Sequence, residues 1–386
     1  MSSGGKLRLG VKADLLHCLE KDLPEETGVP MVDAAILDGA AVVQMLNPGT
    51  SNTFQEYADA VFVPYVSAQL KKTNRVDIVW DIYSLKSTTK EKRGKGIRKR
   101  VASSTQMPTK WKDFLRVDAN KTELFSFLSQ ESARLSTEDG KEVYATHGRE
   151  VLCSSEESDL ANLAPCSQEE PDTRLLLHVV DAVQKGSKKV VIRTVDTDVV
   201  VVAASSFSKI NPDELWVAVG TGSRFRYIAI HELVAAMNSR QCSTLPVFHA
   251  TTGCDTVSSF AGRGKKTTWE TWKVFPEVTQ RSRSRTLKNI QPTQAALKQH
   301  IKRACYQANS WNQALVLAPD VLDPSEWGWT IQTGSGWQTL WTTLPEAAKS
   351  CHELIHCGCR TGCTGRFKCR KAALNCTALC FCSGDC

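Results

Sequence analysis

Short apolar runs rich in β-branched residues alternate along the chain with runs of helical periodicity. Four runs have the length and composition of buried strands: 33–38, 76–81, 189–195 and 215–219. Within 173–184, Leu176, Val179, Val180 and Val183 recur at the spacing of one helix face. Residues 143–152 have the pattern of a β-hairpin. The alternation predicts an α/β fold with a central parallel sheet flanked by helices.

Acidic residues stand at the ends of three of these strands: Asp38, Asp81, and the pair Asp196 and Asp198. Because the carboxyl ends of parallel strands line one crevice, we expect these carboxylates to converge. A single Asp after a strand is more often the N-cap of the next helix, and that alternative stands for each one alone. Several together would repel one another unless cations lay among them, and hard cations prefer oxygen ligands. The pattern therefore predicts a site for Mg²⁺ or Mn²⁺.

Charge is unevenly distributed around a formal net charge of +7. Residues 86–112 hold ten Lys and Arg against one acid, 281–303 hold seven against none, and 131–172 are acidic. One charged run is typically a solvated surface, but two basic runs beside a carboxylate site favour a nucleic-acid partner. We expect this partner to be DNA, bound through its phosphate backbone. No apolar run is long enough for a membrane span, and the start lacks the core of a signal peptide. We therefore expect no membrane contact and a nuclear or cytoplasmic location.

Seven acidic residues resemble, in their order, the metal ligands of the flap endonuclease and XPG branch of the PIN-like nucleases. They are Asp38, Asp81, Glu170, Asp172, Asp196, Asp198 and Asp255. The fragments that carry them lie within 33–275: Ile36-Leu-Asp38-Gly39, Asp77-Ile-Val-Trp-Asp81, Glu170-Pro-Asp172, Asp196-Thr-Asp198 and Gly253-Cys-Asp255. Asp172 is shorter than the Glu of the family's Glu-x-Glu motif, and Pro171 fits only in the first turn of a helix.

The resemblance implies a PIN-like fold and structure-selective hydrolysis of phosphodiesters in DNA by two Mg²⁺ or Mn²⁺ ions. One ion would be held by Asp38, Asp81, Glu170 and Asp172, and the other by Asp196, Asp198 and Asp255. Two such ions about 4 Å apart activate a water and stabilise the leaving oxygen. The alternative is a nucleic-acid-binding protein that keeps the fold without turnover. The chain resembles even more closely a group of uncharacterised animal proteins, often associated with mobile elements, from which no activity carries over.

Basic residues and glycines extend the resemblance beyond the acids. Lys86 and Arg93 are similar to the opening of the family's helical arch, where they would offset charge on the scissile phosphate. The helix-two-turn-helix of the family, whose helix start offers N–H groups to a phosphate of duplex DNA, is matched by Gly262, Gly264, Lys265 and Lys266. A basic surface loop is the alternative for this second motif.

The C-terminal region has the composition of a separate module. Nine of the fifteen cysteines fall within 351–386, which predicts structural Zn²⁺. The spacing resembles the CXC modules of tesmin-like proteins, whose thiolates are shared between zinc ions. Its predicted ligands are Cys357, Cys359, Cys363, Cys369, Cys376, Cys380, Cys382 and Cys386. His352-Glu-Leu-Ile-His356 matches the zinc-protease pattern, but its place among these cysteines favours structural zinc binding.

Five of the ten tryptophans fall between Trp311 and Trp341, a pattern that favours a small aromatic core over a base-stacking platform. The chain of 386 residues thus divides into five predicted parts. These are an N-terminal extension (1–30), a nuclease-type domain (31–280) with an insert (86–168), a basic helical linker (281–310), a Trp-rich segment (311–350) and the Cys-rich tail (351–386).

Overall fold

The protein divides into two compact units in its computed structural model. The sheet unit comprises 19–246 and 308–322, and the second unit comprises 1–18, 247–307 and 323–386. The structure describes residues 2–3, 6–8, 10–21, 23, 28–82, 96–137, 140–168, 170–260, 264–274, 294–332, 336–342, 357–359, 363, 368–371, 375–376 and 380–382. Among these residues, no helix is long and apolar enough to cross a membrane.

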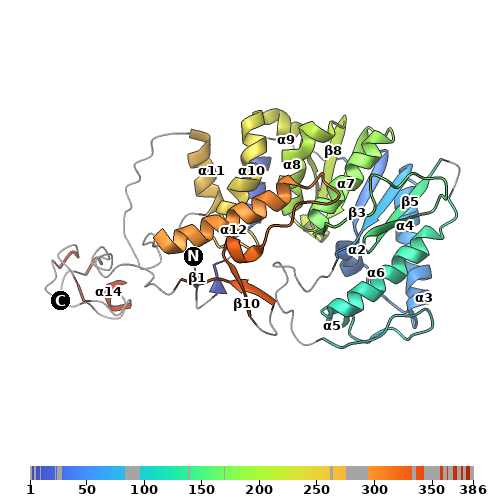
Figure 1. Ribbon diagram of the computed structural model, residues 1–386, viewed down its shortest axis with the longest axis horizontal. Coiled ribbons are helices and arrows are strands. Elements are labelled where there is room, and N and C mark those ends of the chain that lie inside the picture. The colour runs from blue at the N-terminus through green and yellow to red at the C-terminus, as the bar shows by residue number, and fades with distance from the viewer. Residues whose placement is uncertain are drawn as a thin grey trace. The chain divides into compact units, whose positions relative to one another are not determined.

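The sheet unit is built on a seven-stranded sheet with the strand order β6-β5-β4-β3-β7-β8-β9. The strands are β3 (Ala34–Asp38), β4 (Arg75–Val79), β5 (Glu142–His147), β6 (Glu150–Cys153), β7 (Lys189–Thr194), β8 (Glu214–Val219) and β9 (Arg226–Ala229). The five central strands run parallel, and β6 and β9 close the two edges in antiparallel pairing. The α/β class, the four strands and the hairpin at 143–152 are therefore confirmed (Figure 1).

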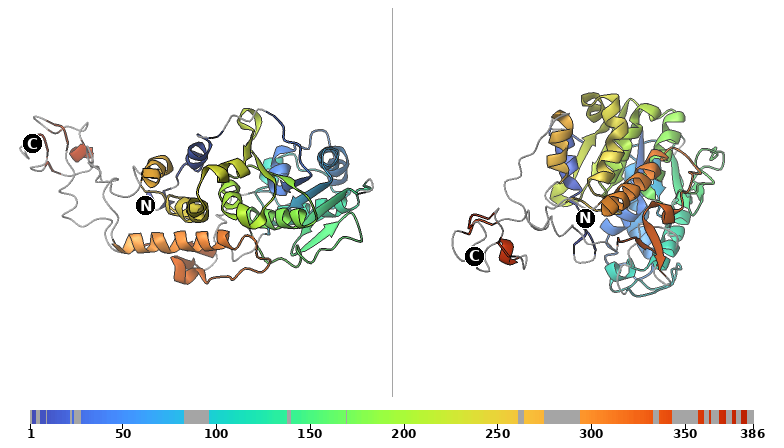
Figure 2. Two further views of the ribbon diagram at one scale, coloured as in Figure 1. Left: turned by 90° about the horizontal axis from the view of Figure 1, so that it is seen from above. Right: turned by 60° about the vertical axis from the view of Figure 1, so that its left-hand side comes forward.

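Helices cover both faces of this sheet. Against one face lie α7 (Pro171–Gln184), α8 (Asp198–Ile210) and α9 (Ile230–Ala236). The other face is covered by α2 (Gly39–Met45), α3 (Phe54–Tyr57), the π-helical turn η1 (Ala58–Phe62), α4 (Val63–Leu70) and α6 (Asp118–Ala133). Figure 2 shows the sheet from two more directions, with the green helices α7 and α8 lying against it. Burial on both faces explains why β3 and β4 are fully buried, as expected for parallel strands.

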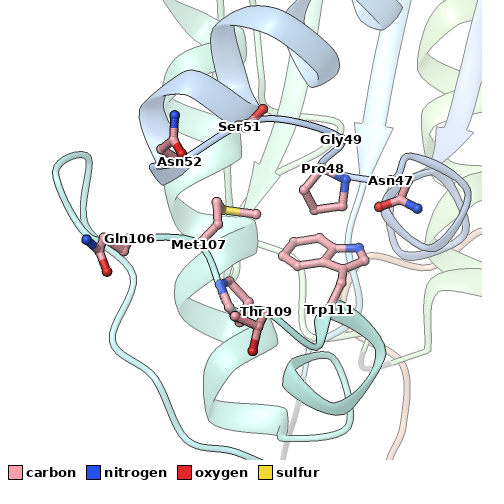
Figure 3. A pocket seen from close by; sticks show the side chains of 10 residues that line it. Asn47, Pro48, Gly49, Ser51, Asn52, Gln106, Met107, Thr109 and Trp111 are labelled. Atoms are coloured by element: carbon pink, nitrogen blue, oxygen red, sulfur yellow. The ribbon is translucent and has the colours of Figure 1, made fainter.

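An aromatic cluster fills the core on the α6 face. The Trp80 ring stacks between Phe62 and Phe125, with ring centroids 5.9 and 4.4 Å away. Trp111 in α5 (Trp111–Phe114) contributes at the edge of the same core, beside a pocket shown in Figure 3. At Gly39 a Cβ atom would lie only 2.3 Å from the Trp80 ring, so this position accepts no larger residue without moving the tryptophan.

The connection order creates a reversal point in the sheet. From β3 the chain adds β4 and β5 on one side, then returns to pair β7 with the opposite edge of β3. In open parallel sheets the ligand crevice lies outside the carboxyl ends of the strands at such a reversal. Here that position falls where β3 ends at Asp38 and β7 ends at Thr194.

A buried network of charges joins β4 to α7. The Arg75 guanidinium binds both oxygens of Asp77 at 2.7 Å and Oδ2 of Asp181 at 2.7 Å. His178 Nδ1 lies 2.6 Å from Oδ2 of Asp77. Because an ionised carboxylate can only accept, Nδ1 is the donor of this hydrogen bond. Burial lowers the pKa of His178. Burial opposes ionisation of Asp77, but Arg75 and His178 outweigh it and hold the pKa of Asp77 below its usual value.

The second unit is helical, with a small hairpin. Its main helices are α1 (Ala13–Glu20), α11 (Lys265–Val274) and α12 (Gln294–Asn312). The unit boundaries fall within α1, α10 (Ser239–Thr251) and α12. The strands β10 (Trp329–Gln332) and β11 (Gly336–Thr339) form an antiparallel hairpin. Arg303 Nη1 in α12 donates to the Gly328 carbonyl at 3.2 Å, next to the buried Trp329. The helix expected to start near Lys265 is therefore confirmed.

Replacing Asp77 by Asn should destabilise the sheet unit strongly, because it leaves the buried Arg75 charge with only one carboxylate. Breaking a buried ion pair on one side costs about 3–5 kcal/mol. The matched control is Asp113→Asn, which breaks the more exposed pair between Asp113 and Arg116 and should cost less than about 1 kcal/mol. Urea unfolding of the full chain measures both. Equal losses in the two variants would show that the network contributes no more than a surface pair.

Candidate metal centres

Three carboxylates converge at the reversal point of the sheet. Asp172, Asp196 and Asp198 each offer an oxygen, and these oxygens lie within 4.8 Å of one another. Asp196 follows β7, Asp198 is the first residue of α8, and Asp172 is the second residue of α7. Pro171 is the first residue of α7, directly after the N-cap Glu170, as its place in this motif requires. The starts of two helices carry partial positive charge, which lowers the cost of gathering these acids.

Asp38 belongs to the same electrostatic group and also caps a helix. Its Oδ1 accepts a hydrogen bond from the Ala41 N–H at 2.9 Å, so the N-cap alternative holds for this residue. Its Oδ2 accepts from the Thr194 hydroxyl at 2.9 Å. Burial, together with the charges of Asp81 and Asp196, raises the pKa of Asp38 to about 7, although the two hydrogen bonds act to lower it. Asp38 is thus both a structural cap and a member of the acidic cluster.

Asp172 shows how closely the acids interact. Burial raises its pKa well above the usual range, and Asp196, Asp198, Glu170 and Asp38 add to the shift. Six of the seven predicted acids are therefore linked by direct electrostatic effects: Asp38, Asp81, Glu170, Asp172, Asp196 and Asp198. The seventh, Asp255, belongs to the second unit, where its Oδ2 accepts from Lys12 Nζ at 2.7 Å. The role of Asp255 as a metal ligand stays a prediction.

The sequence did not point to Thr194, which connects the two central strands of this site. Its hydroxyl donates to Asp38 and accepts from the Asp196 N–H at 3.1 Å. Asp196 Oδ1 in turn accepts from the Asp198 N–H at 2.9 Å. The only feature of the sequence that could have indicated this role is a hydroxyl residue at the end of a strand, between two acidic motifs. Its partner Asp38 lies on a neighbouring strand, far away in sequence.

The donor set fits a divalent cation. Carboxylate oxygens are hard ligands, and the raised pKa values of Asp38 and Asp172 mean that burial and like charge oppose full ionisation of the group. A divalent cation would relieve that repulsion more effectively than a proton. The Asp172, Asp196 and Asp198 oxygens are close enough together to share one such ion.

Stability should depend on pH through Asp38. Its pKa is about 7 in the folded chain, against about 3.9 when unfolded, so the folded state holds a proton that the unfolded state loses. Between about pH 4 and pH 7 the free energy of unfolding should therefore fall as pH rises, when no divalent ion is present. Asp38→Asn keeps an acceptor for the Ala41 N–H but cannot ionise. The variant should therefore lack the decrease in the free energy of unfolding that Asp38 causes.

The control for this prediction is Asp213→Asn, which removes an exposed carboxylate ahead of β8. Thermal unfolding from pH 4 to pH 8 should give the wild-type profile for this control and a flatter one for Asp38→Asn. Added Mg²⁺ or Mn²⁺ should stabilise the wild type more as pH rises, because cation and proton compete for the same oxygens. An unchanged pH profile in Asp38→Asn would contradict the assignment.

The predicted nucleic-acid and phosphate contacts fall partly outside the described residues, where Lys86, Arg93 and Gly262 lie. Gly264 and Lys266 are exposed at the start of α11. Lys265, expected to face a phosphate, is only 1% exposed. Its ammonium donates to the His249 carbonyl at 2.8 Å and to Thr252 Oγ1 at 2.9 Å. That expectation is corrected, because Lys265 already holds α11 against the end of α10, and Lys266 is the lysine open to solvent.

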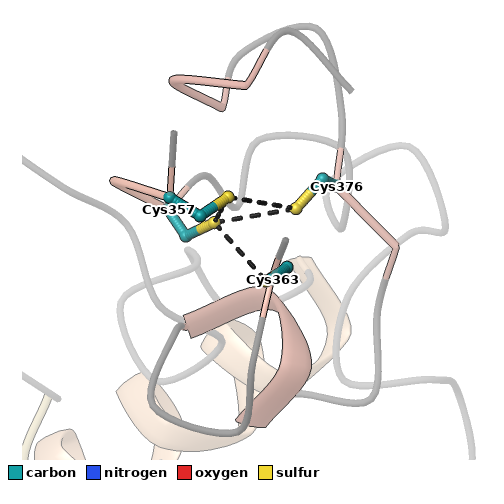
Figure 4. A group of neighbouring side chains, drawn as sticks. Cys357, Cys363 and Cys376 are labelled. Carbon is teal, nitrogen blue, oxygen red and sulfur yellow. Dashed lines mark hydrogen bonds between the residues drawn. The ribbon is translucent and has the colours of Figure 1, made fainter. Parts of the chain in front are cut away.

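The described cysteines of the tail gather into a thiol cluster. Cys357, Cys359, Cys363 and Cys376 form one group, and Cys357, Cys369, Cys376 and Cys380 form a second, each within 4.8 Å. Figure 4 shows the first group around Cys357 and Cys376, which belong to both. Cys382 Sγ lies 3.5 Å from Cys359 Sγ. Cys386, Cys351, His352 and His356 lie outside the described residues.

The sulfur geometry fits shared metal ions. Sγ atoms within the cluster are separated by 3.0 to 3.8 Å, too far for a disulfide bond of about 2.05 Å. Two sulfurs bound to one tetrahedral zinc at about 2.3 Å lie about 3.8 Å apart. Burial opposes ionisation of Cys357, but hydrogen bonds from Cys359, Cys376 and Cys363 lower its pKa to about 6. The cluster is therefore able to hold a metal such as zinc.

Zinc content should depend most on the two shared cysteines. Because Cys357 and Cys376 belong to both groups, Cys357→Ser or Cys376→Ser should release more zinc than Cys363→Ser or Cys369→Ser. Native mass spectrometry of the reduced full chain counts the ions bound to each variant. Chelator should remove the zinc and the structure of 357–382 together. Equal zinc loss in all four variants would contradict the shared arrangement.

No protein-family model matches this chain, and no curated protein matches it.

Proposed function

We propose that this protein is a divalent-metal-dependent nuclease that hydrolyses phosphodiester bonds of DNA in a structure-selective way. One observation carries the proposal: acidic side chains from the end of β3, from the residues after β7 and from the starts of α7 and α8 gather where the strand order of the sheet reverses. Three of them have oxygens within 4.8 Å of one another. Acids that are both buried and crowded cost stability unless a ligand relieves them, and a catalytic metal ion is the ligand their chemistry suits best.

Each part of the site has a distinct task under this proposal. Asp172, Asp196 and Asp198 would hold one Mg²⁺ or Mn²⁺. Asp38, Asp81 and Glu170 would supply the remaining carboxylate ligands of the site. Thr194 keeps Asp38 and Asp196 in register through its two hydrogen bonds. Bound Mg²⁺ or Mn²⁺ would activate a water and stabilise the leaving oxygen of the phosphodiester. No side chain then needs to act as nucleophile.

Basic residues support a polymeric nucleic-acid substrate. Lys266 is exposed at the start of α11, and Arg98, Arg100, Lys110 and Lys112 are exposed between β4 and α6. Lysine and arginine at such surfaces bind phosphates through counterion release, which makes affinity depend on salt. The Cys-rich tail would add a further contact to DNA, in line with the modules that its cysteine spacing resembles.

Asp196→Asn should separate hydrolysis from binding. It removes a metal ligand and relieves repulsion, so turnover of flap, single-stranded or duplex DNA should fall by at least about 100-fold while DNA affinity holds or rises. Lys266→Ala should do the reverse, weakening binding and reducing the log–log salt slope by about 0.9. Cleavage and fluorescence anisotropy in Mg²⁺ or Mn²⁺ measure both effects.

Asp213→Asn is the matched control and should behave as the wild type. Wild-type turnover in Asp196→Asn would reject the metal mechanism. If the wild type binds DNA but cleaves no substrate in either metal, the alternative holds, and the protein binds nucleic acid without hydrolysing it.

A further inference from the structure

A pocket separate from the acidic cluster opens in the sheet unit. Its volume is about 390 Å³, within the usual range for small-ligand sites. One wall is the segment that follows α2 and the other is the segment that leads into α5 (Figure 3). Hydrogen bonds join the walls, from Met107 N–H to the Asn52 carbonyl at 2.8 Å and from Phe54 N–H to the Thr105 carbonyl at 3.1 Å. The pocket is therefore part of the folded structure and needs no rearrangement to form.

Trp111 supplies a fixed aromatic surface in this pocket. Its ring packs against Tyr57 and Phe114, with centroids 5.2 and 5.3 Å away, and its Nε1–H donates to the Val43 carbonyl at 3.4 Å. Figure 3 shows the indole next to Pro48 and Met107 within the pocket. Trp111 remains only partly buried because this side faces the pocket. A flat apolar surface with a fixed orientation suits stacking of a planar ring.

Neutral polar groups surround the indole. Asn47, Asn52 and Gln106 contribute carboxamides, and Ser51 contributes a hydroxyl. None of the lining residues, all of which are described, carries an ionisable side chain. Carboxamides both donate and accept, so they match the mixed donor and acceptor edge of an uncharged heterocycle. A charged ligand group would find no counter-charge inside the pocket.

Positive charge lies immediately outside this neutral pocket. Lys110 and Lys112 flank Trp111 in sequence and are exposed. Lys99 Nζ donates to the carbonyl of Met107, a lining residue, at 3.3 Å. A ligand with a neutral planar part and anionic groups on either side would fit this arrangement.

We propose that this pocket binds a nucleobase turned out of a single strand. Trp111 stacks on the base, Asn47 and Gln106 bond its edge, and Lys110 and Lys112 contact the phosphates on either side. This site is distinct from the carboxylates, and base binding here does not depend on hydrolysis. Through it, the protein would prefer nucleic acid with unpaired bases over continuous duplex.

The test measures binding of a short single-stranded oligonucleotide by fluorescence anisotropy, without added divalent ion. Trp111→Ala should weaken binding by about 5- to 150-fold, the range for losing one stacked base. Trp111→Phe should recover part of the loss. Trp341→Ala is the matched control, because Trp341 is 44% exposed and lies outside the pocket, and it should bind as the wild type. Duplex affinity should change little in any of these variants.

Two further variants and two modified oligonucleotides test the proposal if Trp111→Ala folds poorly. Gln106→Ala and Asn47→Ala remove amides of exposed residues, and each should weaken single-strand binding by a few-fold. A 2-aminopurine base in the strand should lose fluorescence on binding to the wild type and lose less with Gln106→Ala. An oligonucleotide of abasic sites should bind the wild type and Trp111→Ala equally.

The proposal is overturned if Trp111→Phe and Gln106→Ala bind the strand and quench 2-aminopurine as the wild type does. It is also overturned if nucleoside monophosphates bind as tightly as the strand, since the pocket would then serve a free nucleotide. Repeating the series in Asp196→Asn separates the two proposals, because the effect of Trp111 should persist in a chain without turnover.

Discussion

The site depends on one constraint of the sheet: parallel strands end at the same edge, and the strand order reverses there. That edge brings Asp38 beside Thr194 and places the starts of α7 and α8 in reach of both. The same geometry crowds buried carboxylates, which raises the pKa values of Asp38 and Asp172 and costs stability. Other buried interactions stabilise the fold and offset that cost. The buried network of Arg75, Asp77, His178 and Asp181 fixes α7 to β4, and with it the helix that carries Asp172.

Much of the fold could be predicted from the sequence, because strand length and helix periodicity are local properties. The strands that end at Asp38 and before Asp196, the hairpin at 143–152 and the first-turn place of Pro171 all follow from neighbouring residues. The contacts of Thr194 did not, since they depend on which strands pair. Lys265 was predicted to contact a phosphate because the local sequence does not reveal its acceptors, which lie in α10 and just beyond that helix. The pocket beside Trp111 went unpredicted for the same reason, as its two walls come from distant segments.

The two candidate metal centres use opposite ligand chemistry. The sheet unit offers only carboxylate oxygens at its cluster, whereas the described tail offers only thiols. Hard divalent ions prefer the first and zinc the second, so the two sites would load with different ions in the same solution. Cysteine spacing predicted a metal site in the tail, but the folded chain was needed to identify Cys357 and Cys376 as the members common to both groups of thiols.

Gly39 has a consequence for the history of related chains. It stands directly after Asp38, and the Trp80 ring that fills the space of a Cβ atom precedes Asp81. Any side chain at this position must displace the tryptophan and with it the spacing between two of the acids. We therefore expect a chain with a larger residue at position 39 to hold Asp38 and Asp81 at a changed spacing, unless position 80 carries a smaller residue than tryptophan.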